Sequence, residues 1–299
     1  MNISICAIAR LENRYVKEWV DYHLGFGFSH IYLYDNNREG EERLSDVIDT
    51  FGEYEGKVSI IPYHDKVNWP QVTAYQDCWD NREFDWIFYL DLDEFFTFGS
   101  KWDGPKNIEA FISRYMDKTD AILLNWMCYG DNGKLEYSQE PVIERFPNPN
   151  PLRFSPSNLW GKQPVNGHIK TLVSHKAPGF RVKGPHIGEG NYRCCNADGE
   201  YVENMSWQPK QTYANAYIRH YISKTIGEYI DQKIKRGLAD RAPGVKYPLY
   251  YFFDNNKPTI RKIMKYREST RGIQKDSKPL MWWLKLWIKM WIITPLFVR

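Results

Sequence analysis

The sequence lacks the features that mark several large classes of protein. Its 40 basic and 37 acidic residues leave a net charge of only +3, so no broad positive field indicates binding to nucleic acid. Its five cysteines are an odd number without zinc-type spacing, which favours a reducing compartment. No basic segment precedes the first apolar stretch, so we see no signal peptide and expect a cytoplasmic protein.

Aromatic residues, by contrast, are abundant. They make up 16% of the chain and include 12 Trp and 21 Tyr, which is more than a hydrophobic core usually requires. Stacking surfaces for sugars or bases, or contact with a membrane interface, would use the excess.

The first 100 residues alternate between two kinds of segment. Strand-like apolar segments lie at Ile3 to Ala9, His30 to Tyr34, Val58 to Pro62 and Trp86 to Leu90, and helix-like segments lie at Glu12 to Leu24, Glu41 to Phe51 and Gln71 to Asn81. This alternation predicts an α/β fold with a mainly parallel sheet and crossover helices. We interpret residues 1–100 as a nucleotide-binding half.

The remaining segments have a mixed pattern. Between Lys106 and Pro185 we predict a helix at Ile108 to Met116 and strands at Ala121 to Tyr129, Val142 to Phe146, Ile169 to Ser174 and Phe180 to Lys183. Further on we predict helices at Tyr213 to Tyr221, at Ile226 to Leu238 with Gly237 as its stop, and at Pro258 to Tyr266. Residues 101–237 would therefore extend the sheet and build the acceptor side of a cleft.

An acidic motif, Asp91-Leu92-Asp93-Glu94, follows the fourth predicted strand. Side chains two apart on a strand share a face, so we expect Asp91 and Asp93 to converge at the carboxyl edge of the sheet, where ligands of such sheets bind. One or two carboxylates typically hold Mg²⁺ or Mn²⁺ together with phosphate oxygens. The motif predicts a diphosphate site, although acidic residues also end strands simply because loops are solvated.

The last segment, residues 279–299, is rich in Trp and Lys. Trp282, Trp283, Trp287 and Trp291 accompany aliphatic residues, and Lys285 and Lys289 lie inside the apolar stretch. Each charge at bilayer depth costs about 2.5 to 3.5 kcal/mol, which argues against a spanning helix. We expect an amphipathic helix at the inner membrane surface; docking on the protein body or on a second subunit is the alternative.

Several motifs in order resemble those of the family 2 and family 92-like glycosyltransferases. They are Arg10-Leu11-Glu12, Glu18 to His23, Tyr34-Asp35-Asn36-Asn37, Asp91 to Phe95, Lys170 to Val173, Pro185-His186 and Arg219-His220-Tyr221. The resemblance implies a GT-A-type, Rossmann-like domain over residues 1–237, followed by a helical extension over 238–299. It also implies a bacterial enzyme of cell-envelope polysaccharide or lipopolysaccharide synthesis. One departure is Leu11, because such proteins commonly have Asn there.

The resemblance and the strand argument together nominate site residues. Asp91 and Asp93 would bind the cation, completed by His186 or His220, of which we prefer His186. The nucleotide would meet Arg10, Glu12, Asp35, Gln71, Asp91 and Lys170, with Lys170 neutralising a phosphate. Asp131 and Glu189 are candidates for the base that deprotonates the acceptor, with Glu144 as a rival.

We therefore predict a metal-dependent glycosyltransferase that uses Mn²⁺ or Mg²⁺. It would move a sugar from a nucleotide-diphosphate donor, most simply a UDP-sugar, to an envelope glycan or lipid-linked acceptor, with inversion. Two alternatives use the same motif: a nucleotidyltransferase or phosphohydrolase, and a non-catalytic protein that binds nucleotide sugars at the membrane.

Overall fold

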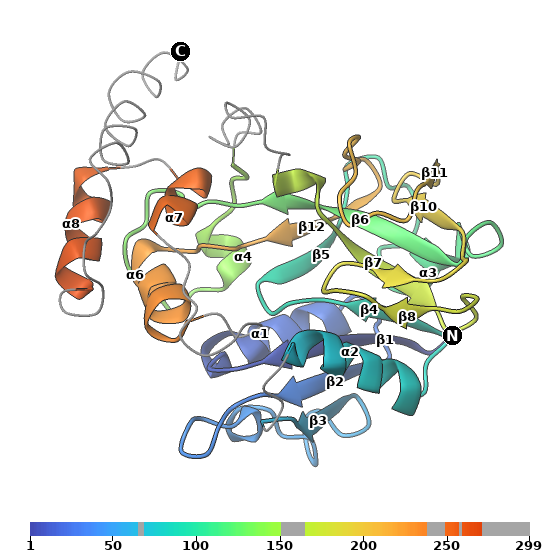
Figure 1. The fold of residues 1–299 in the computed structure, drawn as a ribbon, viewed down its shortest axis with the longest axis horizontal. Helices are drawn as coiled ribbons and strands as arrows, with labels where there is room; N and C mark the ends of the chain where they lie inside the picture. Colours follow the sequence, from blue (N-terminus) through green and yellow to red (C-terminus); the bar gives the residue numbers. More distant parts are fainter. Residues whose placement is uncertain (65–68, 151–164, 238–248, 257–258, 271–299) are drawn as a thin grey trace. The chain divides into compact units, whose positions relative to one another are not determined.

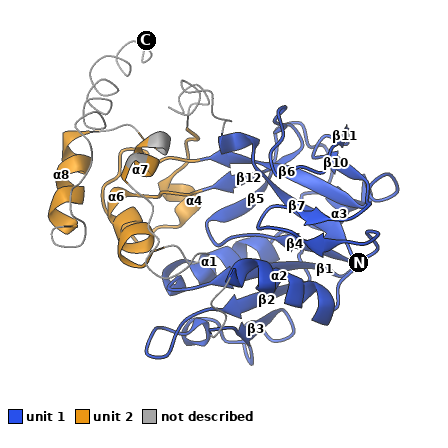
Figure 2. Cartoon of the chain, in the orientation of Figure 1, with its two compact units in different colours: residues 1–128, 162–220, 239–242 blue, residues 129–161, 221–238, 243–299 orange. Residues whose placement is uncertain are grey.

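The computed structural model describes residues 1–64, 69–150, 165–237, 249–256 and 259–270, which Figure 1 draws as ribbons. Contacts within the chain divide it into two compact units (Figure 2). Unit 1 comprises residues 1–128, 162–220 and 239–242, and unit 2 comprises residues 129–161, 221–238 and 243–299. The domain boundary that we predicted at residue 237 adjoins residues outside the description and stays a prediction.

Unit 1 is built on a sheet that has ten strands in the described part of the chain (Figure 1). These strands are β1 (Ile3–Ala9), β2 (His30–Asp35), β3 (Val58–Pro62), β4 (Trp86–Tyr89), β5 (Glu94–Phe98), β6 (Ala121–Cys128), β7 (Ile169–Ser174), β10 (Cys194–Asn196), β11 (Tyr201–Val202) and β12 (Ala216–His220). Their order is β11-β10-β6-β7-β4-β1-β2-β3, and β12 pairs with both β5 and β6. A short hairpin of β8 (Arg181–Val182) and β9 (Gly188–Glu189) lies apart from this sheet.

The direction of the strands separates two regions of the sheet. β3, β2, β1 and β4 all run parallel, as the sequence predicts for crossover connections. β7 then runs antiparallel between β4 and β6, so the second region is mixed. This arrangement confirms the predicted α/β class with a mixed sheet and flanking helices.

Helices α1 (Asn13–Leu24), α2 (Pro70–Asn81) and α3 (Ile108–Ser113) belong to unit 1. Helix α1 buries Trp19 and His23 four residues apart, as expected for an apolar face with a period of 3.6 residues. Trp19 donates its indole N–H to the backbone oxygen of Glu94 at 2.8 Å, and His23 accepts from the backbone N–H of Phe96 at 3.3 Å. Helix α1 therefore fixes the start of β5, directly after the acidic motif.

Unit 2 contains α4 (Val142–Arg145), α6 (Ile226–Tyr229), the π-helix η3 (Ile230–Lys235), α7 (Leu249–Asn255) and α8 (Ile260–Ser269). An ion pair between Arg145 and Glu228 is completely buried in it, with two hydrogen bonds of 3.0 and 2.9 Å. Burial alone would raise the pKa of Glu228, but Arg145, together with Lys224 and Thr225, outweighs it and lowers that pKa below its usual value. The ion pair therefore joins α4 to α6 within this unit.

Most predicted elements are confirmed, and three are wrong. Residues 41–51 contain only the 3₁₀ turn η1 (Leu44–Asp46), because the side chain of Asp35 accepts the backbone N–H of Leu44 at 3.0 Å and holds this segment as a loop. Residues 142–146 form α4 rather than a strand, because Pro141 starts a helical turn whose N–H groups bond back to it. Residues 213–221 contain β12 rather than a helix, because its alternately buried residues fill the space between β5 and β6.

No helix among the described residues has both the length and the apolar character needed to cross a membrane. The segment 279–299, which we expect to lie on a membrane surface, is outside the described residues.

Candidate functional site

The acidic motif forms a turn at the carboxyl edge of the parallel strands. β4 ends at Tyr89, and the backbone N–H of Glu94 donates to the backbone oxygen of Asp91 at 3.0 Å, which closes the turn before β5. We expected Asp91 and Asp93 to lie on the same face of one strand. In the structure both lie between β4 and β5 instead. Each is oriented instead by its own partner from another strand.

Lys170 is the partner of Asp91. Leu172 of β7 pairs with Phe88 of β4, and because the two strands are antiparallel, Lys170 lies beyond the end of β4, beside the turn. Its ammonium nitrogen Nζ is 2.9 Å from Oδ2 of Asp91 and 3.4 Å from Oε2 of Glu94, and its side chain has no exposed surface. Lys170 therefore neutralises carboxylates of the protein itself, whereas we had assigned it to a phosphate.

The second carboxylate oxygen of Asp91 is also engaged. The hydroxyl of Tyr75 donates to Oδ1 at 3.2 Å, and the amide of Gln71 donates to the same oxygen. Both residues lie in the first part of α2, as predicted for Gln71. Asp91 is thus held by three side chains while 32% of its own side chain is exposed, and its assignment to the cation stays a prediction.

Burial and neighbouring charges shift the pKa values of Lys170 and Glu94 in this network. Burial opposes the charge of Lys170, but Asp91 and Glu94 outweigh it and raise the pKa of the lysine above its ordinary value. Burial raises the pKa of the Glu94 carboxyl well above its usual range, and Lys170 only partly offsets this. The Glu94 carboxyl therefore tends to the neutral acid.

His220 is the partner of Asp93. β12 pairs His220 with Glu94 of β5, which brings its imidazole beside the turn. Nε2 of His220 is 3.5 Å from Oδ1 of Asp93, and the two side chains are only 4% and 14% exposed. A carboxylate oxygen and an imidazole nitrogen thus face each other across a short gap.

Four rings gather next to this pair, and we call them the ring cluster: Trp126, His168, His186 and His220. The Trp126 ring centre lies 4.0 Å from that of His220, 5.0 Å from that of His186 and 5.2 Å from that of His168. His168 and His186 stack on each other at 5.2 Å. Trp126 lies on β6, His220 on β12, His168 directly before β7, and His186 between β8 and β9.

Two histidines of the ring cluster, His168 and His186, favour the neutral form. Nδ1 of His186 donates to the backbone oxygen of Ile169 at 2.9 Å, so the proton sits on Nδ1 and Nε2 carries the lone pair. Burial, with the charge of Lys170 second, lowers the pKa of His186 well below its ordinary value. Burial also lowers the pKa of His168, with His220 adding to the effect. The imidazoles of His168 and His186 therefore offer uncharged donors and acceptors.

Three residues that we predicted at the nucleotide edge, Arg10, Glu12 and Asp35, are each engaged by other groups of the protein. Arg10 forms a bidentate ion pair with Glu41, at 2.9 and 2.5 Å, which lowers the pKa of that carboxyl to about 2. Glu12 accepts the first backbone N–H groups of α1 on its own carbonyl oxygen. Asp35 accepts the backbone N–H of Asn37 at 3.0 Å, the turn that its sequence favours.

Leu11 adopts a left-handed backbone conformation, with φ of 55°. Its N–H donates to the side-chain oxygen of Asn37 at 2.8 Å. Asn tolerates this conformation much better than Leu. Leu11, where the resemblance implies Asn, therefore affects the backbone as well as the side chain.

The candidate base Asp131 and its rival Glu144 both belong to unit 2. Asp131, in unit 2, is buried, pairs with Lys262 and accepts the N–H of Gly133 at 2.9 Å in the predicted turn. Glu144 lies on α4 of the same unit. Both assignments, and that of Glu189, stay predictions.

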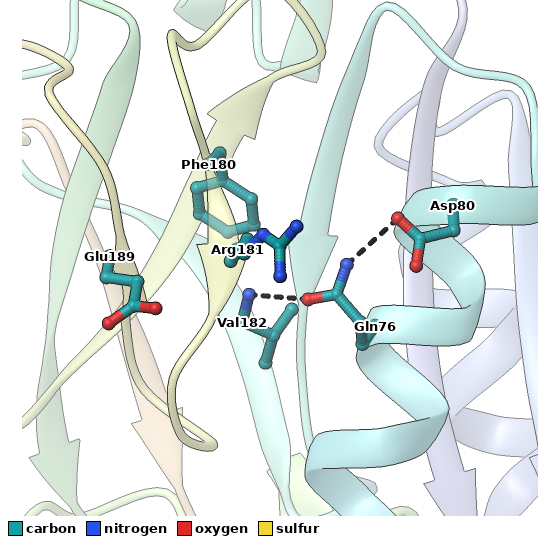
Figure 3. Close-up of a pocket in the computed structure, with 6 residues that line it drawn as sticks. All are labelled: Gln76, Asp80, Phe180, Arg181, Val182 and Glu189. Atoms are coloured by element: carbon teal, nitrogen blue, oxygen red, sulfur yellow. Dashed lines mark hydrogen bonds between the residues drawn. The ribbon is translucent and has the colours of Figure 1, made fainter.

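Glu189 lines a recess of about 480 Å³ that also includes Gln76, Asp80, Phe180, Arg181 and Val182. Figure 3 shows Glu189 on one side of this recess and the α2 residues Gln76 and Asp80 on the other. Asp80 is nine residues beyond Gln71, about 13 Å along the helix at 1.5 Å per residue. The lining of this recess does not include the acidic turn.

The donor set fits a cation only if the substrate completes it. Among the described residues, no group of three or more His, Cys, Asp or Glu is arranged to hold a metal ion. Asp93 and His220 are the pair with suitable chemistry, since adjacent ligands at about 2.1 Å from one ion lie about 3.0 to 3.4 Å apart. Mg²⁺ and Mn²⁺ commonly take their other ligands from phosphate and water.

Sequence reasoning missed Trp126 and His168. Both lie in segments that it treated as ordinary strand or loop, and no motif marks them. The one signal in the sequence that could have pointed to them was the aromatic excess. It indicates ring surfaces but does not show which rings come into contact.

Comparison with known proteins points to one family. A sequence model described as glycosyltransferase family 92 matches residues 3–159, just over half of the chain. A family 92 protein of Ricinus communis is 22% identical over 253 residues, covering 81% of this chain and 42% of the relative. One of Oryza sativa subsp. japonica is 22% identical over 252 residues, covering 82% and 39%. The chain spans about two fifths of the length of these curated relatives, which are plant proteins.

Similar solved structures are more distant. S. aureus TarS in complex with UDP is 14% identical, covers 46% of this chain and 38% of that chain, and has a TM-score of 0.33. Mannosyl-3-phosphoglycerate synthase from Rubrobacter xylanophilus is 10% identical, covers 59% and 54%, and has a TM-score of 0.34. Similarity at this level carries no information on substrate.

Proposed function

Because this chain belongs to glycosyltransferase family 92, we propose that it is a glycosyltransferase that moves a sugar from a nucleotide diphosphate, most simply UDP, to a glycan or lipid-linked acceptor. The observation that supports this most is the acidic turn at the carboxyl edge of the sheet, with Asp93 facing His220 at 3.5 Å. A cell-envelope acceptor, inversion of configuration and a bacterial setting remain parts of the proposal.

The proposed cation, Mn²⁺ or Mg²⁺, would be held by Asp93 and His220 and would act as a Lewis acid toward the departing diphosphate. Asp91 has a different role in this scheme. Through Lys170, Gln71 and Tyr75 it anchors the turn, so the Asp93 carboxylate is presented without rearrangement. His186 is the further imidazole nearby, and its Nε2 lone pair is available to the same region.

A thermal-shift experiment on the full chain tests the site. UDP with MnCl₂ should raise the Tm by about 2 to 4 °C at saturating concentration, because a ligand that binds only the native state stabilises it by mass action. EDTA should abolish the rise. Asp93→Asn and His220→Ala should each remove the dependence on Mn²⁺, because each deletes one of two protein ligands.

Asp103→Asn is the matched control, since this exposed aspartate pairs with Arg114 at the surface and should leave the shift unchanged. A UDP shift of equal size in EDTA and in MnCl₂ would contradict the proposed cation site. Release of free UDP from a UDP-sugar on adding glycan acceptor separates transfer from nucleotidyl transfer, phosphate hydrolysis and binding without turnover.

A further inference from the structure

Three polar groups of the ring cluster have no hydrogen-bond partner among the described residues. They are Nε1 of Trp126, Nδ1 of His168 and Nδ1 of His220. Trp126 is 7% exposed and His220 is 3% exposed, so bulk water does not replace the missing partners. A buried polar group left unpaired costs about 1 to 3 kcal/mol. Three such groups in contact with one another indicate that a ligand completes them.

The chemistry of the cluster selects the ligand. An indole N–H and neutral imidazoles supply hydrogen bonds without charge, and their faces supply apolar ring surface. A phosphate is best bound by a cationic side chain, and Lys170, whose charge acts on His186, is already bound to Asp91 and Glu94. A neutral ring with many hydroxyl groups, a pyranose sugar, fits both properties of the cluster.

The position of the cluster indicates that this sugar is the one attached to the donor nucleotide. Trp126 packs on His220 at 4.0 Å between ring centres, and His220 faces Asp93 at 3.5 Å. In a nucleotide sugar, the sugar is attached to the phosphate that is farther from the nucleoside. If the diphosphate lies at Asp93 and His220, its sugar lies beside these rings.

We propose that Trp126, His168 and His186 form the subsite for the sugar that is transferred, with Trp126 and His168 donating or accepting hydrogen bonds to its hydroxyl groups. This inference rests on the proposed function, because it needs a nucleotide-sugar donor. It assigns specificity for the sugar to uncharged rings on β6 and around β7.

Calorimetric titration of the full chain in MnCl₂ tests the subsite, with UDP, UDP-glucose, UDP-galactose and UDP-N-acetylglucosamine as probes. Trp126→Phe keeps an aromatic ring but removes the indole N–H together with part of the ring surface, a loss of surface that the control variant below shares. It should weaken binding of the preferred UDP-sugar by about 3-fold to 10-fold, the value of one uncharged hydrogen bond, and leave the Kd of UDP within about twofold. His168→Phe, at a partly exposed position, should have the same selective effect.

Trp102→Phe is the matched control. Trp102 is equally buried, at 8% exposed, but its indole N–H already donates to the backbone oxygen of Pro105 at 3.1 Å. This variant should bind every probe as the unmodified chain does.

The outcomes separate the two proposals. Equal weakening of UDP and of the UDP-sugar in Trp126→Phe and His168→Phe would overturn the sugar subsite and point to the nucleoside instead. Unchanged binding of all probes in both variants would overturn it as well. If the unmodified chain binds none of the four probes, the proposed function itself fails, and the subsite fails with it.

Discussion

At the scale of single residues, Trp69 combines strain with exposure. It has φ of 52°, a left-handed conformation that is unfavourable for Trp, and it is 60% exposed directly before α2. Asn accepts this conformation, and little apolar burial is lost at so exposed a side chain. We expect Trp69→Asn to raise the free energy of unfolding by about 0.5 to 1 kcal/mol, measured from urea midpoints.

Phe51→Asn provides the control for Trp69→Asn. Phe51 is 92% exposed and is not among the residues with positive φ, so the same loss of an aromatic side chain should change stability by less than about 0.5 kcal/mol. Equal effects of the two substitutions would show that strain at Trp69 is not the cause. Strain of this kind often lies at functional sites, and Trp69 adjoins the first turn of α2, whose Gln71 and Tyr75 hold Asp91.

At the scale of elements, the contact between α1 and β5 depends on a neutral histidine. His23 donates from Nδ1 to the backbone oxygen of Trp19 at 2.8 Å and accepts from Phe96 on Nε2, and burial lowers its pKa to about 3. The unfolded chain binds a proton below about pH 6.5 and the folded chain does not. The stability that this residue contributes is therefore complete above about pH 6.5 and is lost as the pH falls toward 3.

The expected loss is about 1.4 kcal/mol for each pH unit in that window, or about 2 kcal/mol between pH 6.5 and pH 5. Urea unfolding at pH 7.5 and pH 5 measures it. His23→Gln does not titrate, so the difference between the two pH values should be smaller by about this amount. The same pH dependence in both proteins would disprove the assignment.

At the scale of elements, the direction of the strands also decides which residues come into contact. The parallel strands β1 to β4 could be predicted because each is a compact apolar run, and because helical periods follow β1 and β3, at α1 and α2. The placement of Lys170 could not, because it follows from β7 entering the sheet antiparallel beside β4, and short apolar runs do not record the direction or neighbour of a strand. This single reversal brings a buried ammonium to Asp91.

At the scale of the whole molecule, the prediction concerns attachment to a membrane. We expect deletion of residues 279–299 to move the protein from the sedimenting to the soluble fraction with anionic vesicles, because the Trp residues suit the headgroup boundary and the Lys residues attract anionic lipid. Sedimentation unchanged by the deletion would refute this. Exchange of Lys285 and Lys289 for Glu should abolish the preference for anionic over neutral vesicles while keeping the apolar residues.

The sequence alone determined the α/β class, the first four strands, the acidic motif at the end of the fourth and the family resemblance, because these depend on local periodicity and on motifs that are contiguous in the chain. It also placed Gln71 at the start of a helix, and the structure brings this residue to Asp91. The partners of each carboxylate were decided only by the tertiary structure. Lys170 and His220 reach the turn from β7 and β12, and Trp126 of β6 packs on His220. Such contacts depend on strand order and register, which are set by the packing of the whole sheet.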